Sequence, residues 1–172
     1  MLKRIFGLCL FYVICISNGY ARSVVVYFTP SNSCENQIIH FIDTAQNTID
    51  AAVYAINNEA IVEALLRAHK RGVHVRILTD RVQAGQKSSK VPELEAAGIP
   101  LIRHTRYRIQ HDKFAVFDGQ KAVTGSYNWT DSASRKNAEN CLFFKRFNKT
   151  VNDYSKRFDE LWQLNLKKQK KH

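Results

Sequence analysis

The residues best suited to chemistry lie in one stretch, "HDKFAVFDGQKAVTGSYN", which spans residues 111–128. Between apolar residues it carries polar side chains at fixed spacing: His111, Lys113, Asp118, Ser126 and Asn128. Side chains two residues apart in a strand point to the same face, so we expect His111 beside Lys113. An imidazole next to an ammonium suits nucleophilic attack on a phosphate diester, because the ammonium neutralises the non-bridging oxygens.

Further hydrogen-bond donors follow in "GSYN". Asn128 offers an amide and Ser126 a hydroxyl, while Gly125 is expected to let the backbone approach a phosphate closely because it lacks a side chain. The alternative is a surface hairpin with incidental polar residues. Several specified residues at fixed positions rarely coincide by chance, so the pattern favours a phosphodiester-cleaving site.

The flanking sequence must supply the scaffold that positions these residues. We expect strands at 23–28, 49–56 and 73–80, separated by helices at 35–46 and 59–72. Asn57 or Asn58 is expected to cap the second helix. This β-α-β-α-β order predicts an α/β fold with parallel strands and helical crossovers. The elements expected after it are a polar loop at 83–90, a helix at 91–98, a strand at 99–104, a hairpin turning at 118–120, a strand at 139–146 and a helix at 151–166.

Composition limits the class of protein and of partner. The chain has 172 residues, of which 45% are hydrophobic, which suits one compact domain. Its 26 Lys and Arg residues exceed its 15 Asp and Glu residues, giving a formal net charge of +11. Such a basic surface favours phosphate-rich partners, either nucleic acid or an anionic membrane.

The first residues have the layout of a secretory signal. Lys3 and Arg4 precede an apolar run at 5–16, and small residues lead to Ala21. We expect a signal peptide at 1–21, cleaved after Ala21, and a domain at 22–172. The protein would then be secreted or periplasmic, and the alternative is an uncleaved membrane anchor.

Export would place Cys34 and Cys141 in an oxidising compartment, where they could pair. A disulfide and two buried thiols both fit the sequence. No CxxC or HExxH spacing is present, so we expect neither a metal nor another cofactor.

The 111–128 motif, with "TGSYNWT" and "KNAENCLFF", resembles the signature of the phospholipase D superfamily. The similarity is to its small single-motif members, which include secreted or periplasmic bacterial endonucleases, small bacterial phospholipase D proteins and mitochondrial cardiolipin hydrolases. It covers nearly all of the chain after residue 22. The resemblance implies a single domain with an α-β-α sandwich around a central mixed, largely parallel sheet.

The resemblance also implies a mechanism. His111 would attack phosphorus to form a phosphohistidine, and a second copy of the same histidine would protonate the leaving oxygen and then activate water. Glu139 would accept a hydrogen bond from the other ring nitrogen of His111. The remaining implied roles are phosphate binding by Lys113 and Asn128, a hydrogen bond from Ser126 and structural support from Asp118. No metal is required.

This chain carries the motif once, and none of its other histidines has Lys two positions later. The second catalytic histidine must therefore come from another molecule. We expect a homodimer whose shared active site lies on an isologous two-fold axis.

The substrate remains open between two phosphodiesters. The basic segment before the motif supplies the expected substrate-binding residues Arg103, Arg106, Tyr107 and Arg108. They favour a non-specific endonuclease that binds DNA or RNA backbone, unless they form a solvated edge strand. The alternative is a phospholipase D that reaches a membrane surface through an apolar rim, for which Tyr107, Tyr127 and Trp129 are candidates. A non-catalytic basic binding module is the third alternative.

Overall fold

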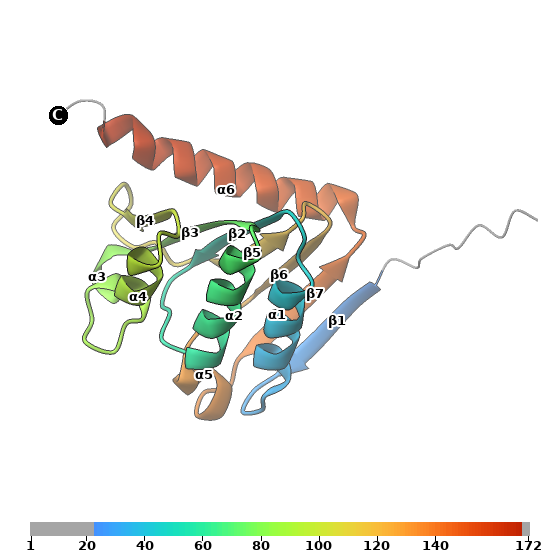
Figure 1. Ribbon diagram of the computed structural model, residues 1–172. Helices are drawn as coiled ribbons and strands as arrows, with labels where there is room; N and C mark the ends of the chain where they lie inside the picture. Colours follow the sequence, from blue (N-terminus) through green and yellow to red (C-terminus); the bar gives the residue numbers. More distant parts are fainter. Residues whose placement is uncertain (1–22, 170–172) are drawn as a thin grey trace, which may run out of the picture.

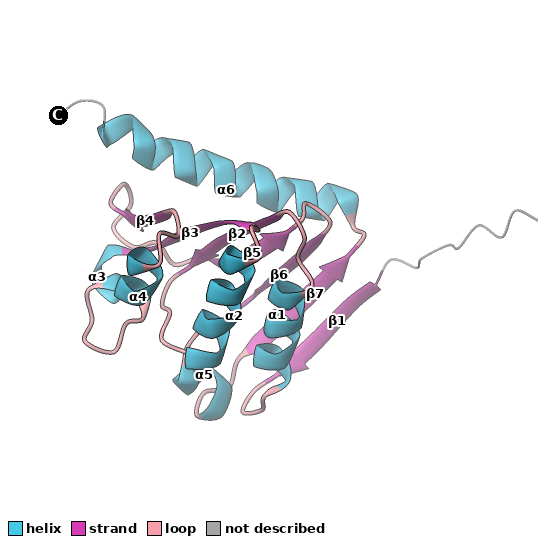
Figure 2. Cartoon of the chain, in the orientation of Figure 1, coloured by secondary structure: helices cyan, strands magenta, loops and turns pink. Residues whose placement is uncertain are grey.

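The computed structural model describes residues 23–169, which form a seven-stranded sheet between helices (Figures 1 and 2). Along the sheet the strands lie in the order β1-β7-β6-β5-β2-β3-β4. Their bounds are β1 Ser23–Phe28, β2 Thr48–Val53, β3 His74–Asp80, β4 Leu101–His104, β5 Lys113–Phe117, β6 Lys121–Gly125 and β7 Asn140–Lys145.

The predicted mixed sheet is confirmed, but the sheet is not largely parallel as expected, because only the neighbours on one side of it are parallel. β2 pairs in parallel with β3, and β3 with β4, as the β-α-β pattern predicts. The pairs β1–β7, β7–β6, β6–β5 and β5–β2 are antiparallel. β1 and β2 therefore run in the same direction without being neighbours. The later hairpin β5–β6 and strand β7 occupy the space between them.

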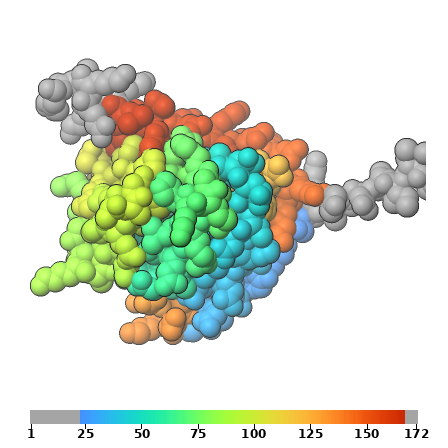
Figure 3. All heavy atoms as spheres, in the orientation of Figure 1, coloured from blue at the N-terminus to red at the C-terminus, as the bar shows by residue number. Residues whose placement is uncertain are grey.

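Helices cover both faces of the sheet, which confirms the α-β-α sandwich. The helices are α1 Ser33–Asp43, α2 Glu59–Lys70, α3 Arg81–Ala84, α4 Val91–Ala96, α5 Asp131–Arg135 and α6 Asn148–Gln169. α1 and α2 lie over one face, and the long helix α6 crosses the other (Figure 1). In the space-filling view α1 and α2 hide the sheet beneath them (Figure 3).

Alternating strand residues fill two hydrophobic cores. On one face, the Phe41 ring of α1 packs edge to face against the rings of Phe117 and Phe143, with centroids 5.3 and 5.2 Å away. Beneath α6, Val116 packs with Phe158. Residues 115 and 117 of β5 face the first core and residues 114 and 116 the second, so this central strand is buried on both faces.

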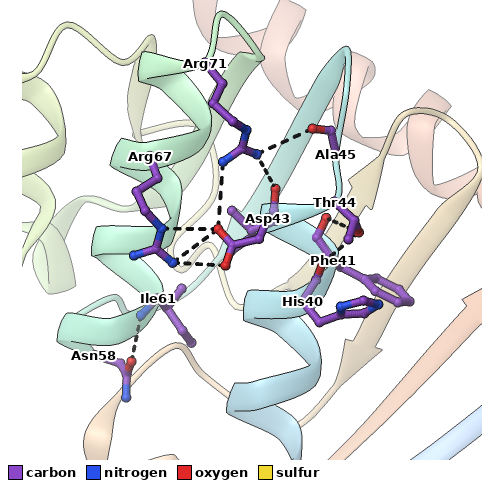
Figure 4. A network of polar contacts seen from close by, with 10 residues as sticks. His40, Phe41, Asp43, Thr44, Ala45, Asn58, Ile61, Arg67 and Arg71 are labelled. Atoms are coloured by element: carbon purple, nitrogen blue, oxygen red, sulfur yellow. Dashed lines mark hydrogen bonds and ion pairs between the residues drawn. The ribbon is translucent and has the colours of Figure 1, made fainter.

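Helix α1 ends earlier than its apolar pattern predicts. Arg71, which follows the last residue of α2, donates a hydrogen bond to the carbonyl of Ile42, and its guanidinium also lies near Asp43 (Figure 4). Arg67 pairs with the same carboxylate at 3.1 Å. Side chains from the end of α2 thus bond to polar groups at the end of α1. The apolar periodicity of α1 does not reveal these contacts. The predicted cap of α2 is confirmed at Asn58, whose side chain accepts from the Ile61 amide at 3.0 Å.

The two cysteines of the domain form a disulfide. Cys34 of α1 and Cys141 of β7 are bonded, and both residues are fully buried. This bond decides between the two alternatives that the sequence leaves open, and it ties α1 to the sheet.

Candidate active site

His111 and Lys113 meet at the start of the central strand β5. Lys113 is the first residue of the strand, and His111 lies just before it. The Lys113 ammonium donates to the His111 carbonyl at 2.7 Å. Burial lowers the pKa of Lys113, while the charges of Glu139 and Asp112 act in the opposite direction. His111 is exposed, so the pair combines an accessible imidazole with a half-buried ammonium.

Tyr54 is a site residue that sequence reasoning missed. It follows β2, whose last residue Val53 pairs with Lys113. The Tyr54 ring lies edge to face against the His111 ring, with centroids 4.7 Å apart, and the Lys113 ammonium lies 5.1 Å from the same centroid. The Tyr54 hydroxyl accepts from Gln83 Nε2 at 2.9 Å. Only the β2–β5 register brings this tyrosine to the motif.

We expect Tyr54→Leu to lower the kcat for bis(4-nitrophenyl) phosphate about tenfold with little change in KM, because the imidazole and ammonium lose the ring that positions them. Tyr54→Phe keeps the ring and should stay within about threefold of the unaltered protein. Steady-state kinetics with thermal melts of both variants separates positioning from folding. Equal losses in both variants would contradict a role for the ring.

Ser126 and Glu139 form a hydrogen-bonded group where β6 ends and β7 begins. The Ser126 hydroxyl donates to one Glu139 oxygen, and Asn137 Nδ2 donates to the other at 2.9 Å. Ser126 Oγ also accepts from the Asn140 amide at 3.0 Å. Within residues 23–169 the His111 ring has no hydrogen bond, so the implied contact between Glu139 and His111 is not made here.

Gly125 is required by strand packing, a reason that the sequence alone does not show. Its φ of +146° is one that L side chains rarely adopt. A Cβ atom there would lie 2.3 Å from the carbonyl oxygen of Asn140. Only glycine lets β6 lie this close to β7, directly before Ser126.

Asn128 lies half-buried between two core residues. Tyr127 and Trp129 are only 3% and 2% exposed, so the prediction that they form an apolar rim for a membrane is wrong. Burial raises the pKa of Tyr127 to about 12, and its hydroxyl bonds to that of Ser134. The Asn128 Oδ1 atom is buried without a hydrogen-bond partner in the described part of the chain. The buried side chains of Tyr127 and Trp129 fix the backbone on either side of Asn128.

Asp118 does not join this group. It lies at the other end of β5, about 16 Å from Lys113 at the usual strand rise. Its carboxylate accepts from the backbone amides of Gln46, Asn47 and Thr48 at 2.7–3.2 Å. It therefore fixes the turn that leads into β2, and its contacts are those of a structural residue.

The four residues expected to bind substrate separate into two groups. Arg103 forms a two-bonded pair with Glu95 at 2.6 and 2.8 Å, so its guanidinium is already occupied. Arg106, Tyr107 and Arg108 lie on the exposed loop after β4, not on an edge strand. The Tyr107 ring stacks on the buried His104 ring with centroids 5.1 Å apart.

His104 should make folding stability depend on pH. The ring is 2% exposed, and its Nε2 accepts from the Tyr107 amide at 2.9 Å. Burial lowers the pKa of His104, with Arg157 and Arg106 in the same direction and the carboxylates of Asp80 and Asp112 opposing.

The unfolded chain therefore binds this proton at higher pH than the folded protein does. We expect the unfolding free energy to decline as the pH falls below about 6.5, until His104 is protonated in the folded state. Urea unfolding between about pH 5 and pH 8 measures the decline, which should be smaller in His104→Gln. An equal decline in that variant would assign the effect to other groups.

Two kinds of feature are absent from residues 23–169. No group of three or more His, Cys, Asp or Glu residues is placed to hold a metal ion. No helix in that range is long and apolar enough to cross a bilayer. The expected signal peptide at 1–21 lies outside the described residues.

The fold and site define an α/β domain with a histidine–lysine pair at the end of a mixed sheet. Residues 38–162 match the family described as cardiolipin synthase, PLD-like domain. The solved structure of Nuc from Salmonella typhimurium, a phospholipase D family member, matches with a TM-score of 0.79 at 30% identity, covering 83% of this chain and 95% of that one. The chain belongs to the phospholipase D superfamily.

Curated relatives carry two kinds of name. A phospholipase D of Rickettsia prowazekii is 39% identical over 130 residues, which cover 76% of this chain and 63% of that protein. A mitochondrial cardiolipin hydrolase of Chlamydomonas reinhardtii is 32% identical over 129 residues, covering 75% of this chain and 57% of that protein. The chain thus matches less than two thirds of the length of these relatives.

Proposed function

We propose that this protein is a phosphodiesterase that uses His111 as its nucleophile, and that its substrate is DNA or RNA. The observation that carries the proposal is the placement of His111 and Lys113 against one aromatic ring at an accessible end of the sheet. Family membership supports the same chemistry.

The reaction has two displacement steps. A ring nitrogen of His111 bonds to phosphorus as the bond from phosphorus to the leaving oxygen breaks, and a second histidine gives that oxygen a proton. Water then loses a proton to the second histidine and attacks phosphorus, which breaks the bond to His111. Lys113 and Asn128 bind the non-bridging oxygens and Ser126 adds a donor. Side chains account for every transferred proton, and we propose the mechanism without a metal.

The second histidine is the His111 of another copy, which makes the proposed enzyme a homodimer with a shared site. Sedimentation should give twice the chain mass. Mixed dimers provide a sharper test, because one His111→Asn subunit should inactivate the site that it shares with an unaltered subunit. Activity that falls only in proportion to the unaltered chains would contradict the shared site.

Export is part of the proposal. We infer a signal peptide at 1–21 and a secreted or periplasmic domain. The Cys34–Cys141 disulfide supports an oxidising compartment. Mass spectrometry of the exported protein should place its N-terminus after Ala21.

A phospholipase D activity is the second candidate. The names of the relatives support it, as does an exposed apolar side chain beside the site, since Ile109 is 50% exposed two residues before His111. The net charge of +11 and the exposed Arg106 and Arg108 favour nucleic acid. A binding module without catalysis is the remaining alternative.

The deciding experiment incubates the purified protein, in EDTA, with DNA, with RNA and with vesicles of phosphatidylcholine or cardiolipin. Cleavage of nucleic acid that requires His111 supports the nuclease. Release of lipid head groups with intact nucleic acid would assign the phospholipase instead. If bis(4-nitrophenyl) phosphate is also untouched, the phosphodiesterase proposal is wrong.

A further inference from the structure

A cavity lies beside the proposed site, between α3 and the loop after β4. Its volume is about 290 Å³, and its lining includes Arg81, Val82, Tyr107 and Arg108. That volume is just below the usual range for ligand sites, about 300–1,000 Å³, so the cavity suits no more than a single nucleotide unit.

A shared carboxylate joins this cavity to the catalytic residues. Asp80, which lines the cavity and is 5% exposed, accepts from the Gln110 amide at 3.1 Å, directly before His111. Its other oxygen accepts from the amides of Val82 and Gln83 at the start of α3. Both Asp80 oxygens are therefore occupied, so the carboxylate fixes the cavity next to His111.

The cations of the cavity are not used by the fold. Among residues 23–169, neither Arg81 nor Arg108 has a carboxylate partner, whereas Arg103 nearby is paired with Glu95. Arg81 and Arg108 are both exposed, and both line the same cavity. Two unpaired guanidinium groups on either side of a cavity are suited to one phosphate.

An aromatic ring completes the lining. Tyr107 is 49% exposed, and one face of its ring stacks on His104. The Tyr107 amide donates to His104 Nε2, and the other side of that imidazole contacts Asn165. His104 thus holds the tyrosine in place, and the exposed surface of the Tyr107 ring remains available for a base to stack on.

We propose that this cavity is a nucleotide subsite, in which Arg81 and Arg108 bind the phosphate next to the one that is cleaved and Tyr107 stacks on its base. The inference rests on the proposed phosphodiesterase and chooses nucleic acid over phospholipid as its substrate. Besides the two arginines and the tyrosine, the cavity is lined by Asp80, Val82, His104 and Thr105, so one aliphatic side chain stands among polar and aromatic ones, which does not suit acyl chains.

The first test compares Arg81→Gln/Arg108→Gln and its two single variants with Lys70→Gln, a control that removes one charge at the C-terminal end of α2. The double variant should lose about ten- to a hundredfold in kcat/KM on a single-stranded oligonucleotide, and much less on bis(4-nitrophenyl) phosphate, which has no second phosphate. The salt dependence of oligonucleotide binding should weaken by about 0.7 per lost phosphate contact. A double variant that matches the Lys70→Gln control would overturn the subsite.

The second test separates base stacking from phosphate binding. Tyr107→Leu should weaken binding of an ordinary oligonucleotide about tenfold, and weaken binding of an abasic one far less. Equal losses on both would overturn the stacking role.

Fluorescence anisotropy of the oligonucleotides measures binding even if no substrate is cleaved, so the subsite is judged apart from the proposed reaction. Hydrolysis of phospholipid vesicles by a protein that does not bind the oligonucleotides would overturn the subsite and leave the phosphodiesterase intact.

Discussion

His111→Asn is expected to lower the kcat for phosphodiester hydrolysis by about 10⁴-fold or more, the largest effect of any single substitution. The same residue serves as nucleophile in one subunit and as acid and base in the other, so both copies lose their function at once. Asparagine removes the nucleophilic nitrogen while keeping a polar side chain. Because His111 is exposed, the fold should tolerate the change.

Hydrolysis of bis(4-nitrophenyl) phosphate and of DNA measures this loss, with His74→Asn as the matched control. His74 is an exposed histidine at the start of β3, at the opposite end of the sheet from His111. The control should behave as the unaltered protein does. A His111→Asn variant that retains more than about a tenth of the activity would exclude a covalent role for the residue.

Removing the disulfide is expected to cause the largest loss of stability. The bond between Cys34 and Cys141 closes a segment with a sequence separation of 107. A crosslink across about 100 residues lowers the entropy of the unfolded chain by the equivalent of up to about 4.7 kcal/mol, and measured losses are about 2–5 kcal/mol. Cys34→Ala/Cys141→Ala should lose an amount in that range.

Urea unfolding of the double variant and of the unaltered protein, each with and without reductant, measures the difference. Reductant should lower the stability of the unaltered protein toward that of the variant and leave the variant unchanged. If the variant and the oxidised protein unfold at the same urea concentration, the crosslink contributes nothing to stability. Activity should survive in the variant, because neither cysteine supplies a group to the proposed reaction and the pairing of Cys141 with Gly125 is made by the backbone.

Much of the scaffold follows from local pattern. The β-branched run of β1, the apolar stripe of α2 with its Asn58 cap and the Asp-Gly turn between β5 and β6 each depend on residues near in sequence. Local pattern predicts the ends of helices and strands less accurately where distant residues decide them. Helix α1 stops at Asp43 because α2 supplies its terminal contacts.

What the sequence by itself determined is the set of residues in the motif, from which its chemistry is predicted. His111, Lys113, Ser126 and Asn128 lie at short, fixed spacing, and this pattern predicts a phosphodiester site that the proposed experiments test. Because the motif occurs once and the reaction needs two histidines, the sequence also predicts a homodimer, which the mixed-dimer experiment tests.

Tertiary structure alone decided which other residues surround that motif. Strand register places Tyr54 against His111 and Lys113, although 57 positions separate it from His111 in the sequence. The same packing assigns Arg103 to Glu95, buries Tyr127 and Trp129, and joins Arg81 to Arg108 across one cavity. The physical reason is that sheet order and pairing depend on the balance of contacts over the whole chain, which no short pattern contains.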